Sequence, residues 1–150
     1  MNNNFCAFIL SHGRPDRVKT YKTLRKSGYS GRIIIIVDNE DKTINRYIDN
    51  FGEKNVFVFD KKYMSKTFDE ADNFKNRKSI VYARNYCFIL AKELGIKYFI
   101  QLDDDYYWFG HRGVKGAITT KKLDLIFNYL VEFLKNTNVT SVCMSQGATT

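Results

Sequence analysis

Three adjacent aspartates, Asp103, Asp104 and Asp105, follow the apolar run at residues 98–102 in the stretch YFIQLDDDYYW. Adjacent carboxylates repel one another and raise each other's pKa values, unless a cation compensates the charge. Mg²⁺ and Mn²⁺ are hard cations that prefer carboxylate oxygens. Side chains alternate along extended backbone, so we expect Asp103 and Asp105 to point one way and Asp104 the other. The motif predicts a divalent metal site (Mn²⁺ or Mg²⁺), with a solvated acidic turn as the alternative.

Arg84 is a charged residue within an apolar helical pattern, VYARNYCFILAKELG, and lies at the edge of the face expected to be buried. A guanidinium that is removed from water needs an anionic partner. We expect the aspartates or a bound diphosphate to be that partner. The alternative is a side chain that extends into solvent.

The elements that position these residues alternate between strand and helix patterns. Strands are predicted at Phe5–Leu10, Arg32–Val37, Val56–Phe59, Lys97–Leu102 and Thr140–Ser145. Helices are predicted at Pro15–Lys26, Lys42–Asn50, Ile80–Gly95 (capped by Ser79) and Thr120–Lys135, with a long polar loop at Asp60–Lys78. This order predicts an α/β fold with a mostly parallel sheet and helices on both faces.

Several polar segments follow the predicted strands. Ligands bind outside the carboxyl ends of the strands in folds of this kind. We therefore expect one edge of the sheet to bring together Ser11–Arg17, Asp38–Asp41, Asp60 and Asp103–Asp105.

The composition fits one domain of 150 residues with a core, since 44% of the residues are hydrophobic. Lys and Arg number 24 and Asp and Glu 16, a formal charge of +8 that favours a polyanionic or phosphate-bearing partner, or only keeps the protein in solution. The three cysteines lack the spacing of a disulfide framework or a zinc site. No segment resembles a membrane span or a signal peptide, so we expect a cytoplasmic protein, and no protein partner is evident.

Four motifs together resemble one family. They are SHGRPDR after the first strand, VDNED after the second, DNF in the long loop, and VYARNYCFILAKELGIKYFIQLDDDY. Each is weak alone, but their order and spacing are specific. The aspartate motif resembles the DXD motif of GT-A glycosyltransferases, which have a Rossmann-like fold. The whole set, over residues 5–109, resembles the phage-associated TET-associated glycosyltransferase family, which would place the protein in the host cytoplasm.

This resemblance implies a metal-dependent transfer of sugar from a nucleotide-sugar, with UDP-sugars favoured, to a hydroxymethylated pyrimidine base in DNA. It implies that Asp103 and Asp105 hold the metal, and that Asp103 or Asp104 contacts the donor. The other donor-binding residues that it implies are Ser11, His12, Gly13, Arg14, Arg17, Asp38, Asp72, Asn73, Arg77 and Arg84. For Asp72 and Asn73 the alternative is an Asx turn within the loop.

The acceptor side is less defined in the sequence. Displaced bases stack on aromatic rings, so Trp108 is a candidate acceptor contact, with His111 and Arg112 available to a phosphate. The alternatives are an aromatic that closes the core and an ordinary surface histidine. We expect a single donor-binding domain at residues 1–150 in which a C-terminal acceptor-binding portion is short or missing. No catalytic base is assigned.

Three other functions remain open at this point. A metal-dependent nuclease or phosphoesterase would also use clustered aspartates, with Asp38 and Asp60 as further ligands. A sugar nucleotidyltransferase has a similar sheet, but SHGRPDR lacks its glycine-rich loop. A non-catalytic module that binds a nucleotide-sugar or DNA could use the same fold.

Overall fold

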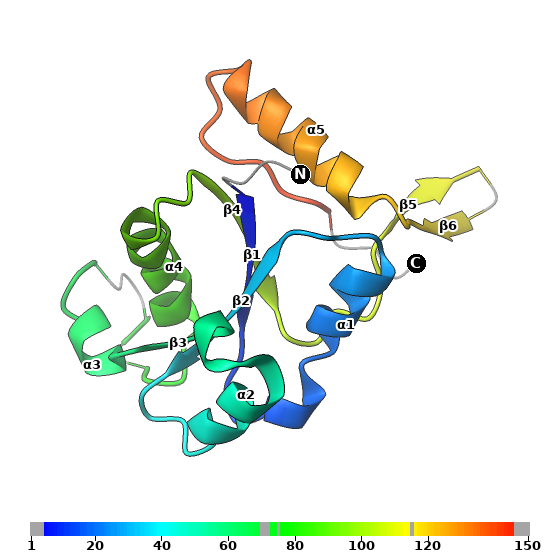
Figure 1. The fold of residues 1–150 in the computed structure, drawn as a ribbon. Helices are drawn as coiled ribbons and strands as arrows, with labels where there is room; N and C mark the ends of the chain where they lie inside the picture. Colours follow the sequence, from blue (N-terminus) through cyan, green and yellow to red (C-terminus); the bar gives the residue numbers. More distant parts are fainter. Residues whose placement is uncertain (1–4, 70–72, 75, 115, 146–150) are drawn as a thin grey trace.

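A computed structural model of the chain describes residues 5–69, 73–74, 76–114 and 116–145. Its main sheet has four strands: β1 (Phe5–Leu10), β2 (Arg32–Asp38), β3 (Val56–Phe59) and β4 (Tyr98–Asp103). They lie in the order β3-β2-β1-β4, and every neighbouring pair is parallel (Figure 1). The expected α/β fold with a parallel, Rossmann-like sheet is confirmed.

Helices cover both faces of this sheet (Figure 1). One face is covered by α1 (Lys19–Lys26), α2 (Ile44–Phe51) and α5 (Leu123–Lys135), and the other by α3 (Lys61–Met64) and α4 (Val81–Glu93). The β2 strand illustrates why both layers are needed, because its residues are apolar without alternation. Ile35 belongs to the core that contains Phe127 of α5, whereas Ile34 belongs to the core that contains Leu90 of α4.

The helix predicted at residues 15–26 is divided into two. A 3₁₀ helix occupies Pro15–Arg17, and α1 begins only at Lys19, because Val18 has a non-helical ψ of 75°. The first turn of α1 is bonded to the end of β4: the Thr20 N–H donates to the Asp104 carbonyl at 3.1 Å. This bond fixes where the helix begins, and no pattern within residues 15–26 indicates it.

The segment before α4 is more ordered than the predicted loop. It contains α3, whose N-cap is Asp60: Oδ1 of Asp60 accepts from the Tyr63 N–H at 2.8 Å. Ser79 precedes the N-cap of α4, which is Ile80, and its Oγ accepts from the Val81 N–H at 3.3 Å. The two short polar side chains therefore order the chain on either side of this segment.

A two-stranded antiparallel hairpin follows β4 and was not predicted. It consists of β5 (Gly110–Gly113) and β6 (Gly116–Thr119), and it projects from the body of the molecule (Figure 1). Strands are identified in a sequence by alternating apolar residues. The hairpin lacks this pattern because glycines occupy several of its positions. Gly110 is required there, because a Cβ atom would lie 2.2 Å from the Ile118 carbonyl oxygen.

The strand predicted at Thr140–Ser145 is wrong. Residues 140–145 have no regular secondary structure, and most of their side chains are exposed. Met144 alone among them packs partly against the core beside α5. Val142 and Cys143 stay exposed, so the segment has no apolar face that would hold a strand against the sheet.

Candidate functional site

A cleft of about 380 Å³ opens at the carboxyl ends of β1 and β2, where ligands bind in folds of this type. The loop after β1 forms one wall. The segment before α4 and the first turn of α4 form another, so the positive end of the α4 dipole faces the cleft. The polar and charged side chains around it include Ser11, His12, Arg14, Asp38, Lys61 and Lys78.

The Asp104 carboxylate lies buried beneath the loop after β1, with 1% of the residue exposed. Ser11 Oγ donates to Asp104 Oδ2 at 2.5 Å and lies 2.8 Å from the Tyr47 hydroxyl. Arg14 Nη2 is 2.8 Å from Asp104 Oδ1 without directing an N–H bond at it, so this contact is an ion pair. Burial raises the pKa of Asp104, although Ser11 and Arg14 act to lower it. Asp104 therefore anchors the loop from below.

Asp38, at the end of β2, is buried and contacts Lys61, His12 and the Glu40 backbone. Its carboxylate lies 2.9 Å from Lys61 Nζ and 2.7 Å from His12 Nδ1, and it accepts from the Glu40 N–H at 3.1 Å. Lys61 is itself only 7% exposed. Buried charges are tolerated when they are paired in this way, and the pair gives the cleft a fixed wall.

The Gly13 backbone holds the loop in a sharp turn. Its φ of +67° lies in the left-handed region, which glycine adopts without strain. The Gly13 N–H donates to Asp41 Oδ2 at 2.6 Å, and the Arg14 N–H donates to the Tyr47 hydroxyl at 2.9 Å. Burial acts to raise the pKa of Asp41, but the hydrogen bonds from Thr43 and Gly13 outweigh it and lower the pKa.

Asp103 points away from Asp104, towards α4. Its Oδ1 lies 3.0 Å from Arg84 Nη2, and the Gln101 side chain fixes that part of α4 by donating to the Arg84 carbonyl at 2.9 Å. Asp103 pairs in register with Leu10, which lines the cleft. The expectation that an aspartate is the anionic partner of Arg84 is confirmed, and so are the opposite directions of Asp103 and Asp104.

Asp105 is exposed and has no hydrogen bond or ion pair with any residue of the described ranges. Asp103 Oδ2 is likewise uncommitted within the described part of the chain. Nowhere in that part do three His, Cys, Asp or Glu side chains gather in a metal-binding group. Mg²⁺ often takes only one or two carboxylates and completes its shell with water and phosphate oxygens. Asp103 Oδ2 and the Asp105 carboxylate are the uncommitted oxygens of the aspartate motif.

Three other donor-binding candidates, Arg17, Asn73 and Arg77, lie outside the cleft lining. Arg17 is exposed on the 3₁₀ helix. Arg77 forms an ion pair with Glu40. Asn73 Nδ2 donates to the Tyr82 hydroxyl at 3.0 Å and to the Asn76 carbonyl at 3.3 Å, which orders the loop before α4. Asp72 lies outside the described residues.

The acceptor candidates lie on and beside the hairpin. Trp108 is 37% exposed, and its Nε1 donates to Thr119 Oγ1 at 2.7 Å. His111 is an exposed β5 residue, and Arg112 occupies β5 opposite Ala117. The neighbouring Phe109 is 5% exposed and closes the core, which is the alternative expected for an aromatic residue in this run.

Sequence reasoning missed the cations and the tyrosine that complete the site. In the sequence, Lys61 resembles an ordinary surface lysine. Its position just after the end of β3 was the available signal, because ligands bind at the carboxyl ends of the strands. Lys78 lies two residues before the N-cap of α4. Tyr47 is fully buried on α2, and its hydroxyl is the only polar atom on an apolar helix face, which a periodicity pattern does not register.

A family model for TET-associated glycosyltransferases matches residues 5–148. The chain belongs to this family. No curated protein and no solved structure matches the sequence. Membership supports a glycosyltransferase-type function for the chain. None of the helices in the described ranges is long and apolar enough to cross a membrane.

Proposed function

We propose that this family member is a GT-A-type glycosyltransferase that binds a nucleotide-sugar, favouring a UDP-sugar, with a divalent metal (Mn²⁺ or Mg²⁺). The acceptor is a hydroxymethylated pyrimidine base in DNA. The observation that supports the proposal most is the cleft itself. Cationic side chains and the positive end of α4 surround a space at the strand ends, and Asp103 pairs in register with Leu10 of its lining. This combination suits a diphosphate bridged to a metal ion.

The described side chains suggest how the leaving diphosphate would be stabilised. Arg14 and Lys78 offer positive charge within the cleft, and Arg84 lies beside Asp103. Asp103 and Asp105 would hold the metal, which when bound supplies further neutralisation of phosphate charge. Asp104 and Asp38 would position the loop and the wall, since their charges are already paired within the protein.

The nuclease alternative is less compatible with the same side chains. It would need metal ligands from several strand ends, and Asp38 and Asp60 were its candidates. Asp38 is bonded to Lys61 and His12, and Asp60 caps α3. Recruiting Asp38 as a metal ligand would break contacts that involve both of its carboxylate oxygens, and Asp60 already uses Oδ1 to cap α3.

A thermal-shift panel tests the donor site. UDP, several UDP-sugars and GDP-sugars are added with and without Mn²⁺ to the wild type and to Asp105→Ala. Saturating donor should raise the melting temperature by about 5–10 °C, because a ligand that binds only the native state stabilises it by mass action. The shift should need metal and should be lost in Asp105→Ala.

The matched control is Asp49→Ala, which removes an exposed aspartate from α2. It should respond to the donor as the wild type does. A donor that gives a shift is then used for transfer to DNA containing hydroxymethylated cytosine, with unmodified DNA as the blank and the mass of the product as the measurement. Absence of any donor shift in a cooperatively melting protein would contradict the proposal.

A further inference from the structure

A second cavity, of about 460 Å³, lies between α1 and the β5–β6 hairpin. We call this cavity the lysine groove. It is lined mainly by Lys19, Lys22, Lys26, Lys121, Tyr107 and Trp108. It is separate in its lining from the cleft at the strand ends. Trp108 is the acceptor candidate expected from the sequence, but the lysines of the groove have no role in the functions assigned so far.

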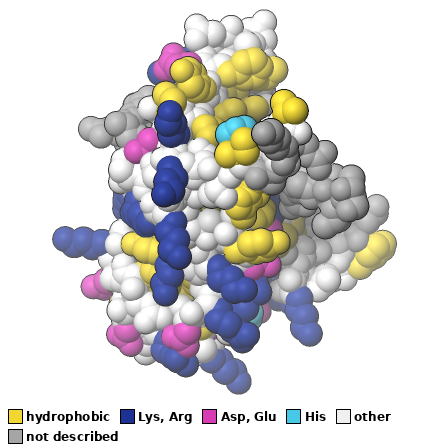
Figure 2. Space-filling model, turned by 90° about the vertical axis from the view of Figure 1, so that its right-hand side faces the viewer, with side chains coloured by type: hydrophobic (Ala, Val, Ile, Leu, Met, Phe, Trp, Pro, Cys, Tyr) yellow, Lys and Arg dark blue, Asp and Glu magenta, His cyan; other side chains and the backbone are white. Residues whose placement is uncertain are grey.

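The lysines of the groove form one positive stripe. Lys19, Lys22 and Lys26 recur at the spacing of one helix face and cover about 10 Å of α1. All four lysines are exposed, and none has an ion pair with any residue in the described ranges. Figure 2 looks onto this side of the molecule and shows a column of Lys and Arg side chains beside hydrophobic ones. An unpaired stripe of this length matches roughly three phosphates of one nucleic-acid strand.

Trp108 gives the groove a rigid aromatic surface. Its Nε1 bond to Thr119 and its contact with Gly110 fix the ring on the hairpin: a Cβ atom at Gly110 would lie 2.3 Å from Trp108 Cζ2. Tyr107, next to it, is 84% exposed. Fixed, partly exposed rings beside lysines are the components of single-strand binding sites, where bases stack on the rings and phosphates contact the cations.

The groove is joined to the cleft through one short segment. Thr20 Oγ1 of α1 donates to the Asp103 carbonyl at 2.6 Å and accepts from the Tyr106 N–H at 2.9 Å. The chain therefore passes from the cleft carboxylates to the groove aromatics within residues 103–108. Asp104 and Trp108 are four residues apart, which limits their separation to about 14 Å.

We propose that the lysine groove binds a single strand of nucleic acid, with its phosphates on the α1 lysines and one unstacked base against Trp108. This inference rests on the proposed function, because it locates the DNA acceptor on a particular surface. It also goes further, since it assigns the strand to a groove outside the donor cleft. The hairpin then supplies an acceptor-binding element after β4.

Trp108 is the only tryptophan of the chain, so its fluorescence reports on the groove directly. Oligothymidylate is titrated into the protein without any donor or metal. Stacking on Trp108 should quench the emission.

Lys22→Glu combined with Lys26→Glu should weaken binding about tenfold or more and lower the salt-dependence slope by about 1.4, the value for two lost single-strand phosphate contacts. Trp108→Leu, followed by anisotropy of labelled oligothymidylate, should weaken binding roughly tenfold.

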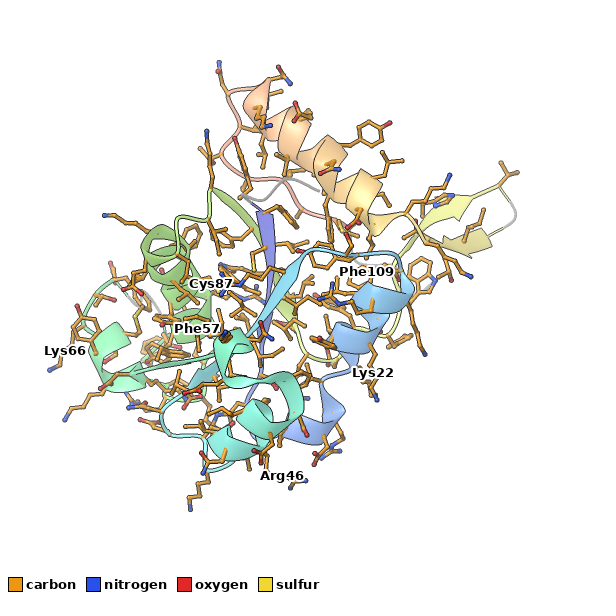
Figure 3. All side chains as sticks on the ribbon, in the orientation of Figure 1. Lys22, Arg46, Phe57, Lys66, Cys87 and Phe109 are labelled. Carbon is orange, nitrogen blue, oxygen red and sulfur yellow. The ribbon has the colours of Figure 1, made fainter. Side chains whose placement is uncertain are left out.

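The control reverses two lysines elsewhere, Lys66→Glu with Lys92→Glu, and has the same net charge. Figure 3 labels Lys22 on the α1 side and Lys66 on the opposite side of the molecule. Equal affinity and equal salt slope for the two double variants would overturn the proposal. So would oligothymidylate binding that leaves Trp108 emission unchanged, or binding to anionic phospholipid vesicles but not to oligothymidylate.

The assay distinguishes failure of the groove from failure of the proposed function. The titration contains no donor. If oligothymidylate does not quench Trp108 emission in a protein that keeps its donor-dependent thermal shift, only the groove proposal is overturned. Intact quenching without any sugar transfer to DNA would instead contradict the proposed reaction. Lys22→Gln with Lys26→Gln, which removes charge without reversing it, should give an intermediate loss of affinity.

Discussion

The cleft at the strand ends and the lysine groove are similar in size but opposite in their electrostatics. In the cleft, Asp38 and Asp104 are buried and paired with Lys61, His12 and Arg14. In the groove, the lysines are exposed and have no ion pair within the described part of the chain. The buried aspartates of the cleft are already paired inside the protein, whereas the groove lysines are available to a partner.

This difference indicates two kinds of recognition. Side chains fixed by internal pairs lose little entropy when a compact ligand enters, which suits a donor that must be held in one orientation. Exposed lysines are flexible and bind a polyanion through the release of counterions, which depends on salt more than on exact geometry. The cleft should therefore be sensitive to single substitutions, and the groove to the sum of its charges.

The largest effect is expected from breaking a cleft pair. Lys61→Met leaves the buried Asp38 carboxylate with one fewer cation, and losing one partner of a buried pair costs about 3 kcal/mol. Urea denaturation should register this loss in the free energy of unfolding. Lys62→Met, at the exposed neighbouring position, should change that free energy by less than about 0.5 kcal/mol. Equal stability of the two variants would show that the buried pair is unimportant.

An intermediate and local effect is expected from the hairpin. Gly110→Ala places a Cβ atom 2.2 Å from the Ile118 carbonyl oxygen, and overpacking of this kind costs about 2 kcal/mol. Trp108 emission should shift and oligothymidylate affinity should fall, while the donor-dependent thermal shift persists. Gly113→Ala is the matched control, because the atom nearest to its Cβ is the flexible end of the Ile118 side chain, at 2.6 Å. Unaltered emission in Gly110→Ala would separate Trp108 from the hairpin.

The smallest effect is expected from the loop after β1. The pKa of Asp41 is lowered in the folded protein, so its contribution is present above the ordinary value of 3.8 and is lost as pH falls through the folded value. Asp41→Asn should therefore lower stability by about 1 kcal/mol at neutral pH, and the difference from wild type should vanish at strongly acidic pH. Asp49→Asn, at an exposed position, should have no such pH dependence. A constant difference between Asp41→Asn and wild type would contradict this assignment.

Much of the fold could be predicted because its central strands are apolar without interruption. β1, β2 and β3 were located within a residue or two, and the parallel order followed from the helices between them. The hairpin could not be predicted, since Gly110, Gly113 and Gly116 remove the alternation that marks a strand. The false strand at residues 140–145 has the β-branched composition of a strand, but only Met144 of its apolar side chains packs against the core.

The position of the candidate site could be predicted, but the hydrogen bonds and ion pairs of its aspartates could not. The rule for strand ends brought Ser11, Asp38 and the aspartate motif to one edge, and Arg84 was correctly expected to meet a carboxylate. Which aspartate is buried depends on contacts between residues far apart in the chain. Ser11 and Asp104 are 93 positions apart, and no local pattern reports their hydrogen bond.

The Thr20 hydroxyl has a consequence for how members of such a family can diverge. It attaches the end of β4 to α1, so the position of the aspartates is set by the body of the protein and not by the hairpin that follows. The hairpin can therefore change in length or sequence without moving the carboxylates. The nucleic acid held next to the cleft can therefore differ between family members while the donor chemistry stays the same. Exchanging residues 110–119 is a direct route to engineering acceptor preference.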